Sequence, residues 1–400
     1  MAMDNKQKLE KILGRGIISE YLPSYEEFIK SALTKKLRIY IGIDATGDTL
    51  HLSHAKNFMF LEELRLLGHE VIVLFGDFTA RLGDPSDRSA ARVQLSQEEV
   101  DSNVKSWIEQ IKPLMDFEAT ENPPQIKYNS TWLKDMTLED LMELAPNFTV
   151  QQMIERDMYQ KRIKEEKPIY LHEFLYPLMQ GYDSVAMDVD VEFCGTDQIF
   201  NAMAGRTLQK RINNKEKFVI AANLMEDPET GLLMSKSKNI GVFLNTTAEE
   251  MFREIMAQPD SMTKILLINN TRIELDEIEQ IVSGGPLEAK LKTAHEITKI
   301  IHGQTSADSA RDEFNRKIRD KTLTDHDFVE IEFHGGESLK DVLLNAKIVE
   351  SGSDFFRLIN GGAIKSIEND VAISDTNEPA QPGKYKIGKK RLIQLKKSAS

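Results

Sequence analysis

The feature that most constrains the fold lies between residues 37 and 77, where strand and helix patterns alternate. Leu37–Ile43 is rich in β-branched and aromatic residues, which predicts a strand. Leu52–Leu67 carries apolar residues at helical spacing and is followed by Gly68, a typical helix stop. Val71–Phe75 is a continuous apolar run, as expected for a strand buried on both faces of a parallel sheet. Together these patterns predict a β-α-β unit.

The same alternation continues beyond this unit. Ser96 and Glu99 form a capping box, which predicts a helix from about Gln97 to Met115. Short strands are expected at Ile126–Tyr128 and Phe218–Ala222. Strands that alternate with helices indicate an α/β domain with a doubly wound parallel (Rossmann-like) sheet, whose ligand binds at the carboxyl ends of the strands.

The pattern becomes helical after Asn245. Thr246 and Glu249 suggest a second capping box, and helical periodicity then recurs three times. The three segments are Glu274–Val282, Leu287–Ile301 and Asp308–Arg319. A smaller unit follows Gly335, with two short helices, alternating residues and a basic terminal strand. We expect a doubly wound domain over 1–245, an all-helical domain over 246–325 and a small α+β module over 335–400.

Composition narrows the class of protein. The 400 residues are 40% hydrophobic and 29% charged, and no apolar run approaches the 18 or so residues of a membrane span. The first residues lack the charged-then-apolar pattern of a signal peptide. A single cysteine, Cys194, excludes a disulfide framework and argues against a cysteine-based zinc site. These features lead us to expect a cytoplasmic protein.

The net charge of −13 argues at first against nucleic acid, but binding depends on local patches. Arg206–Lys217 carries five cations against the single acid Glu216. Lys384–Lys397 carries seven cations and no acid. Each stretch is either an RNA contact or an ordinary solvated face, and the sequence leaves both interpretations open.

The turn from Asp44 to His54 joins the first predicted strand to the first predicted helix. Phosphates bind at such turns, against the positive end of the helix dipole. His51 and His54 lie three residues apart, on one face of the first helical turn, and can donate to a phosphate or to the oxygen of the breaking bond. The alternatives are a two-histidine metal site, which lacks a third ligand at metal spacing, and a purely structural role in capping and packing.

Two motifs resemble the signatures of one enzyme family. H-L-S-H at 51–54 resembles the His-x-Gly-His signature of class I aminoacyl-tRNA synthetases. Met234–Ser237 (M-S-K-S) resembles the end of their Lys-Met-Ser-Lys-Ser signature, and it follows the last predicted strand, as it does in that family. An ordinary polar loop is the alternative for M-S-K-S alone, but the ordered pair of motifs favours the synthetases.

Three further motifs resemble the bacterial tyrosyl-tRNA synthetases. Gly83–Ser86, with Arg88 and Arg92 behind it, resembles their loop after the second strand. Tyr176-x-x-x-Gln180-x-x-Asp183 resembles their amino-acid-binding helix, and its spacing puts all three side chains on one helical face. Gly195–Gln198 resembles their Gly-Ser-Asp-Gln turn. An amphipathic helix with a polar stripe is the alternative for the second motif alone.

The resemblance implies roles for individual residues. Tyr40 and Asp183 would bind the phenolic hydroxyl of tyrosine, and Asp84, Tyr176 and Gln180 its ammonium group. The catalytic groups implied are Thr46, His51, His54, Arg88, Arg92 and Lys236. The ATP-binding residues implied are Gly42, Asp44, His51, Ser53, His54, Asp197, Gln198, Met234, Ser235, Lys236 and Ser237.

The resemblance also implies partners: tyrosine, ATP with Mg²⁺ on its phosphates, tRNA, and a second copy of the chain in a homodimer. The 246–325 domain would recognise the anticodon and the 335–400 module would bind RNA. A site built around a substrate hydroxyl rejects the analogue without it by about 10⁴–10⁵, a magnitude established for a tyrosyl-tRNA synthetase. No editing domain is then needed to exclude phenylalanine.

The sequence departs from the family pattern at two positions. Ser53 stands where the family has glycine, which lets a nucleotide approach the backbone closely. Leu233 replaces the first lysine of the second signature, and Lys238 is the nearest substitute. We expect an active enzyme. The alternatives are a tryptophanyl enzyme, a catalytically silent RNA-binding protein and a small-molecule adenylyl transferase. An NAD dehydrogenase is disfavoured because no G-x-G-x-x-G follows the first strand.

Overall fold

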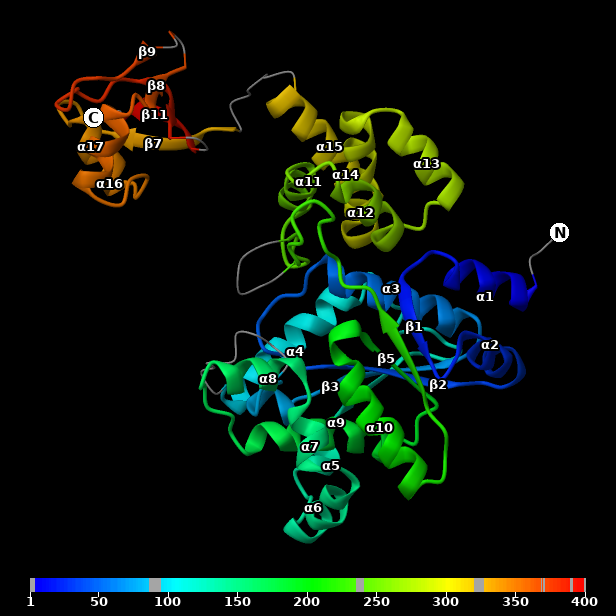
Figure 1. The fold of residues 1–400 in the computed structure, drawn as a ribbon. Helices are drawn as coiled ribbons and strands as arrows, with labels where there is room; N and C mark the ends of the chain where they lie inside the picture. The colour runs from blue at the N-terminus through cyan, green and yellow to red at the C-terminus, as the bar shows by residue number, and fades with distance from the viewer. Residues whose placement is uncertain are drawn as a thin grey trace. The chain divides into compact units, whose positions relative to one another are not determined.

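A computed structural model of the chain describes residues 4–85, 95–234, 241–319, 327–367, 369, 371–388 and 391–398. The chain forms two compact units, Met1–Glu313 and Phe314–Ser400 (Figure 1). None of the helices within the described ranges is both long enough and apolar enough to cross a bilayer.

A six-stranded sheet forms the centre of the first unit. Its strands are β1 (Ile18–Leu22), β2 (Arg38–Ile43), β3 (Glu70–Phe75), β4 (Gln125–Tyr128), β5 (Val191–Gly195) and β6 (Phe218–Ala222). Their order is β1-β6-β5-β2-β3-β4, and the five strands from β6 to β4 pair in parallel. The doubly wound parallel core is therefore confirmed, whereas β1 adds an antiparallel edge strand that the sequence analysis did not predict.

Helices surround this sheet in the first unit (Figure 1). The larger ones are α1 (Asn5–Leu13), α2 (Tyr25–Thr34), α3 (Leu52–Leu66), α4 (Gln97–Ile111), α9 (His172–Met187) and α10 (Ile199–Ile212). Shorter ones are α5 (Ser130–Leu133), α6 (Leu138–Leu144), α7 (Val150–Ile154), α8 (Asp157–Lys164) and the turns η1 (Thr79–Arg81), η2 (Ala145–Asn147) and η3 (Thr196–Gln198). The predicted capping box of Ser96 and Glu99 opens α4.

Alternation along β5 assigns the two faces of the sheet. Successive side chains of a strand point to opposite faces. Phe193 stacks on Phe60 of α3, with ring centroids 5.2 Å apart. Glu192 points the other way and accepts a hydrogen bond from Gln180 of α9. Tyr40 lies beside Glu192 in the parallel register, so it faces α9 as well. Candidate site residues therefore lie on the α9 face.

The helical segment of the first unit comprises α11 (Ala248–Met256), α12 (Met262–Asn270), α13 (Leu275–Ser283), α14 (Pro286–His302) and α15 (Gln304–Phe314). The helices were predicted, but the capping box of α11 was misplaced by one residue: Thr247 and Glu250 form it, not Thr246 and Glu249. Asn270 at the end of α12 donates to the carbonyl of Leu52 at 2.7 Å, which fixes this segment against the beginning of α3.

The second unit has its own five-stranded sheet, in the order β7-β11-β10-β8-β9. After η4 (Asn315–Arg319) its elements are β7 (Val329–Phe333), α16 (Leu339–Asn345), α17 (Gly352–Asn360), β8 (Ile364–Ser366), β9 (Val371–Ala372), β10 (Gly383–Ile387) and β11 (Arg391–Lys397). Phe355, Leu343 and Ile393 are fully buried in a core of its own. Two points differ from expectation: β7 precedes residue 335, and the basic tail forms two strands of a hairpin instead of one.

Candidate active site

Backbone hydrogen bonds join the first signature motif to residues 242–244, which follow the second one. Leu52 N donates to Val242 O at 3.0 Å, and Leu244 N donates to Leu50 O at 2.9 Å. His51 pairs with Phe243 in the bridge between these bonds. The chain that directly follows the second signature is therefore paired with the beginning of α3, as a split ATP site requires.

The second signature itself lies mostly outside the described residues. Ser235, Lys236, Ser237 and Lys238 fall in the range 235–240, so their predicted roles stay predictions. Met234 is described: its N–H donates to Met225 O at 3.4 Å. Gly241 adopts a φ of +127°, and a Cβ at this glycine would lie 3.2 Å from Met234. The two ends of the loop are therefore close together.

The two histidines lie at the amino end of α3. His51 is the N-cap residue, and its N–H donates to Nδ1 of His54 at 3.3 Å. Their ring centroids are 3.9 Å apart. Ser53, which departs from the family glycine, is half-buried in this first turn, and Thr46 is exposed in the preceding loop. These side chains lie where the helix dipole favours an anion.

Asp44, a predicted ATP-binding residue, contacts Tyr176, a predicted amino-acid-binding residue. It follows β2, and its carboxylate accepts hydrogen bonds from Tyr176 Oη at 3.0 Å and from Thr79 Oγ1 at 2.7 Å. A Cβ at Gly76 would overlap this carboxylate, so the close approach requires glycine. Burial and the neighbouring Asp44 raise the pKa of Tyr176 well above its usual value, so its hydroxyl stays a donor.

Asp84 and Gln198 meet although they are far apart in the sequence. Gln198 Nε2 donates to Asp84 Oδ2 at 2.7 Å, and Asn201 Nδ2 donates to Gln198 Oε1 at 3.0 Å. Asp197 is exposed beside Gln198. The structure thus brings the predicted ammonium-binding carboxylate to the predicted ribose-side turn. Ser86, Arg88 and Arg92 fall in the undescribed range 86–94, and their roles stay predictions.

Asp183 is held by two donors that the sequence analysis missed. Trp132 Nε1 donates to Asp183 Oδ1 at 2.7 Å, and Asn129 Nδ2 lies 3.4 Å from Oδ2. Burial raises the pKa of Asp183 well above its usual value, although both donors oppose the shift. Asn129 directly follows β4, so the rule that ligands gather at carboxyl ends of strands would have identified it.

Tyr40 and Asp183, predicted to share the substrate hydroxyl, have different partners in the structure. Tyr40 Oη lies 3.0 Å from Ser184 Oγ, and the tyrosine is fully buried. Gly42, two residues further along β2 and on the same face, is exposed although β2 is an interior strand. A Cβ at Gly42 would lie 3.7 Å from the ring of Tyr40.

Gln180 donates to a buried carboxylate beneath the site. Its Nε2 lies 3.0 Å from Glu192 Oε1, and Lys217 forms an ion pair with the other oxygen of Glu192. Burial lowers the pKa of Lys217, and Glu192 opposes that shift. The sequence analysis missed Ser184 and Glu192, and it placed Lys217 in a basic stretch that was either an RNA contact or a solvated face, whereas Lys217 is buried. A glutamate inside an otherwise apolar strand segment was the available signal for Glu192.

Four of the five cations of the stretch Arg206–Lys217 form ion pairs within the first unit, the pair of Lys217 with Glu192 among them. Arg206 and Lys210 both pair with Glu216, at 3.1 and 2.7 Å. Lys215 lies 3.4 Å from Asp190. In the second unit, Lys384 lies over the ring of Phe328 at 4.8 Å. These intramolecular contacts account for much of the first basic stretch and favour the solvated-face interpretation there.

Comparisons with known proteins identify the family. A profile described as tRNA synthetases class I (W and Y) matches residues 32–318. The tyrosine–tRNA ligase of Carboxydothermus hydrogenoformans is 38% identical, with 99% of each chain covered. That of Thermotoga maritima is 36% identical, with 96% of each chain covered.

Solved structures show the same fold. A C-terminally truncated mitochondrial tyrosyl-tRNA synthetase of Aspergillus nidulans superposes with a TM-score of 0.66 at 21% identity, covering 79% of this chain and 94% of that one. A tyrosyl-tRNA synthetase of Archaeoglobus fulgidus, complexed with L-tyrosine, gives 0.59 at 19% identity, covering 77% and 100%. The sequence relatives and the matched profile extend the likeness from fold to family. The chain belongs to the class I tRNA synthetases, in the group of the tryptophan and tyrosine enzymes.

Proposed function

We propose that this chain is a tyrosine–tRNA ligase, which activates tyrosine with ATP and transfers it to the terminal ribose of tRNA. The observation that carries the proposal is the backbone pairing of Leu50–Leu52 with Val242–Leu244, because it joins the first signature to the chain segment that directly follows the second. The bond from Tyr176 to Asp44 supports it by joining a predicted amino-acid-binding residue to a predicted ATP-binding residue. The reaction serves protein synthesis, so we place the enzyme in the cytoplasm.

The first step needs positioning and charge stabilisation more than covalent catalysis. The tyrosine carboxylate is already anionic at neutral pH and attacks the α-phosphate of ATP in line. A carboxylate–phosphate bond forms, the bond to the bridging oxygen breaks, and pyrophosphate leaves. His51 and His54 would stabilise the growing charge from the amino end of α3, with Thr46 beside them. Arg88, Arg92 and Lys236 would act from their loops.

Magnesium would bind to the phosphates of ATP, because Mg²⁺ keeps several waters and rarely occupies an all-protein cage. Among the described residues, no group of three histidine, cysteine or acidic side chains is arranged to hold a metal ion. Gly42, Asp44, Ser53, Asp197, Gln198 and Met234–Ser237 would contact the nucleotide. Ser53 would add a hydrogen bond where the family glycine has none.

Tyrosine would bind on the α9 face of the sheet. Asp183 would accept from the phenolic hydroxyl, with Tyr40 below the ring. Asp84, Tyr176 and Gln180 would hold the ammonium group, and Asp84 and Tyr176 are already linked to neighbouring site residues. Burial raises the pKa of Asp183, and ionisable groups with strongly shifted pKa values are concentrated at functional sites. This supports a role for Asp183 in substrate binding.

We assign catalysis to residues 1–245. For the transfer to tRNA, residues 246–325 would recognise the anticodon and residues 335–400 would bind RNA more generally. Deleting residues 320–400 removes the second sheet, including β7, without cutting the first unit. We expect the truncated protein to keep ATP–pyrophosphate exchange and to lose about tenfold in kcat/KM for tRNA, as lost phosphate contacts imply. Loss of exchange would contradict this division.

A homodimer would bury the apolar side chains exposed on α6 and at the beginning of α7. Leu138, Met142 and Val150 are 74%, 65% and 66% exposed. Side chains of this kind are typical of subunit interfaces. We expect light scattering to give the mass of two chains, and the double change Leu138→Glu/Met142→Glu to give one. A native dimer that persists in this variant would place the interface elsewhere.

Aminoacylation tests the proposed function. Purified protein, ATP, Mg²⁺ and labelled tyrosine should yield tyrosyl-tRNA with a bacterial tRNA pool, and labelled tryptophan should yield none. A protein that binds tRNA but charges it with no amino acid would be a silent RNA-binding protein, and the proposal would be wrong.

A further inference from the structure

A buried ion pair lies beneath the candidate tyrosine site. Lys217, directly before β6, pairs with Glu192 of β5, and the two residues are only 1% and 2% exposed. Lys217 Nζ also donates to Ser184 Oγ at 2.9 Å, and this oxygen lies 3.0 Å from Tyr40 Oη. Gln180 Nε2 donates to Glu192 Oε1 at 3.0 Å. The Lys217–Glu192 pair is thus the centre of a network that ends at two residues of the site.

Stability alone does not explain this pair. Removing two charges from water is expensive, and apolar residues of similar size in such a place are often neutral or stabilising. The helix packed over the pair also accommodates it: a Cβ at Gly205 of α10 would overlap Lys217 Nζ and lie 2.7 Å from Ser184 Oγ. The surroundings of Lys217 and Glu192 are therefore adapted to charged groups.

The carboxylate of Glu192 determines which way the amide of Gln180 faces. An ionised carboxylate only accepts hydrogen bonds, so the amide must turn its nitrogen to Glu192. Its oxygen then points away from the pair. Among the described residues, that oxygen accepts no hydrogen bond. An ammonium group only donates, so a fixed amide oxygen is the partner it requires.

Lys217 restricts the side-chain amide of Gln180 to this single orientation. An uncharged amide in place of Glu192 could donate to the amide oxygen of Gln180 and hold that amide in the opposite orientation. The ion pair with Lys217 occupies one oxygen of the Glu192 carboxylate and leaves the other as an acceptor for Gln180, which allows only one arrangement. Without the charges, both orientations of the amide become possible, and only one of them suits an ammonium group.

We propose that Glu192, in its ion pair with Lys217, is a positioning residue for amino-acid recognition, which turns the oxygen of Gln180 toward the ammonium group of the substrate. The inference rests on the proposed function, because it takes tyrosine as the substrate. It goes beyond that function by assigning a specificity role to two residues that do not touch the substrate.

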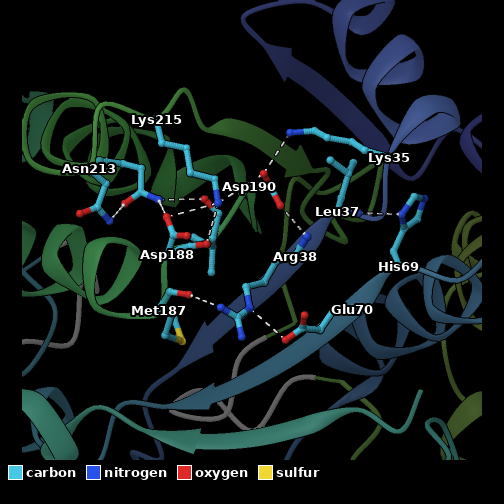
Figure 2. Close-up of polar contacts among 12 residues, drawn as sticks. Lys35, Leu37, Arg38, His69, Glu70, Met187, Asp188, Asp190, Asn213 and Lys215 are labelled. Carbon is cyan, nitrogen blue, oxygen red and sulfur yellow. Dashed lines mark hydrogen bonds and ion pairs between the residues drawn. The ribbon is translucent and has the colours of Figure 1, made fainter. Parts of the chain in front are cut away.

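A second ion pair on the same chain segments provides a matched control. Lys215 and Asp190 lie two residues before Lys217 and Glu192, with Nζ 3.4 Å from Oδ1. Figure 2 shows this pair at the amino ends of the strands, where Asp190 also accepts from the backbone N–H of Arg38 at 2.8 Å. Lys35 donates to the same carboxylate at 3.1 Å. Neither member contacts Gln180, so removing this pair tests for a general effect on the strands.

The test compares two double variants, Glu192→Gln/Lys217→Met and Asp190→Asn/Lys215→Met. Each removes both charges of its pair, so no unpaired charge is left buried. Ligands are tyrosine and 3-(4-hydroxyphenyl)propionate, which has the phenol and the carboxylate but no ammonium group. For the first variant we expect KM for tyrosine to rise about tenfold or more, as expected for a hydrogen bond to a charged group. We expect kcat, KM for ATP and Ki for the propionate to stay unchanged, and the control variant to resemble the unmodified protein.

A Gln180→Leu background shows whether the pair acts through this glutamine. In that background the Glu192/Lys217 changes should raise KM for tyrosine no further, because coupled residues are not additive. If the double variant fails to fold, Glu192→Asp keeps both charges, withdraws the carboxylate from Gln180 by one methylene, and should raise the same KM.

Three results would overturn the inference. Equal weakening of tyrosine and the propionate would show that the pair only shapes the site, and no change in either would show that it has no part in recognition. If the unmodified protein binds no tyrosine, the proposed function fails, and the inference fails with it. If the unmodified protein binds tyrosine but the Glu192/Lys217 variant shows no selective loss of tyrosine binding, only the inference is wrong and the proposed function stands.

Discussion

Replacing Asp183 by alanine should reduce the preference for tyrosine over phenylalanine from about 10⁵ to about 10², because the carboxylate is the buried acceptor that phenylalanine cannot satisfy. The preference of 10⁵ is the value established for a tyrosyl-tRNA synthetase. In the structure Asp183 is 3% exposed, and Trp132 orients it through a 2.7 Å hydrogen bond. The measurement is kcat/KM for both amino acids in ATP–pyrophosphate exchange. An unchanged ratio would show that the phenol binds elsewhere.

Asp183→Asn serves as the matched variant, because its amide oxygen can still accept from Trp132. The raised pKa of Asp183 means that the folded protein holds this proton more tightly than the unfolded chain. The free energy of unfolding therefore falls as pH rises from the unfolded pKa of about 3.9 toward the raised folded pKa. Asp183→Asn removes this loss. Its Tm should match the parent near pH 4 and exceed it increasingly toward neutral pH; a Tm difference independent of pH would contradict this account.

Replacing His54 by asparagine should lower kcat for exchange by about 10²-fold, the usual loss of one group that stabilises transition-state charge. Nδ1 of His54 accepts from the N–H of His51, and the asparagine oxygen can take over that structural bond. The change then removes only the Nε2 side of the ring, which is the side available to a phosphate. KM for tyrosine should stay unchanged.

Circular dichroism controls for the helix cap in this variant. If His54→Asn folds normally and keeps its full kcat, the histidines have the capping and packing role that the sequence left open, and the phosphates are stabilised by other groups. A metal role would instead show as activity that depends on a transition metal when Mg²⁺ is in excess.

Local patterns along the chain predicted the parallel core well. β2, α3 and β3 lie within one or two residues of their expected bounds, because Val71–Phe75 can only be a doubly buried strand and Gly68 ends the helix before it. The strand β1 was missed because its residues alternate weakly: Ser19 and Glu20 interrupt the apolar pattern, and pairing with the distant β6 determines its conformation.

Site residues could be predicted where they belong to one local sequence motif. They could not be predicted where residues from distant segments come together only in the fold. Tyr176, Gln180 and Asp183 share one helical face, which spacing alone reveals. Their partners come from other elements: Asp44 from the end of β2, Trp132 from α5 and Glu192 from β5. Such contacts depend on strand order and on the packing of α9, which no local pattern encodes.

Amino-acid-dependent ATP–pyrophosphate exchange, measured with each of the twenty amino acids in turn, tests the central claim most directly. It reports on the assembled ATP and amino-acid sites without requiring tRNA. We predict exchange with tyrosine and background rates with the other nineteen, including phenylalanine and tryptophan. Exchange with a different amino acid, or with none, would contradict the account.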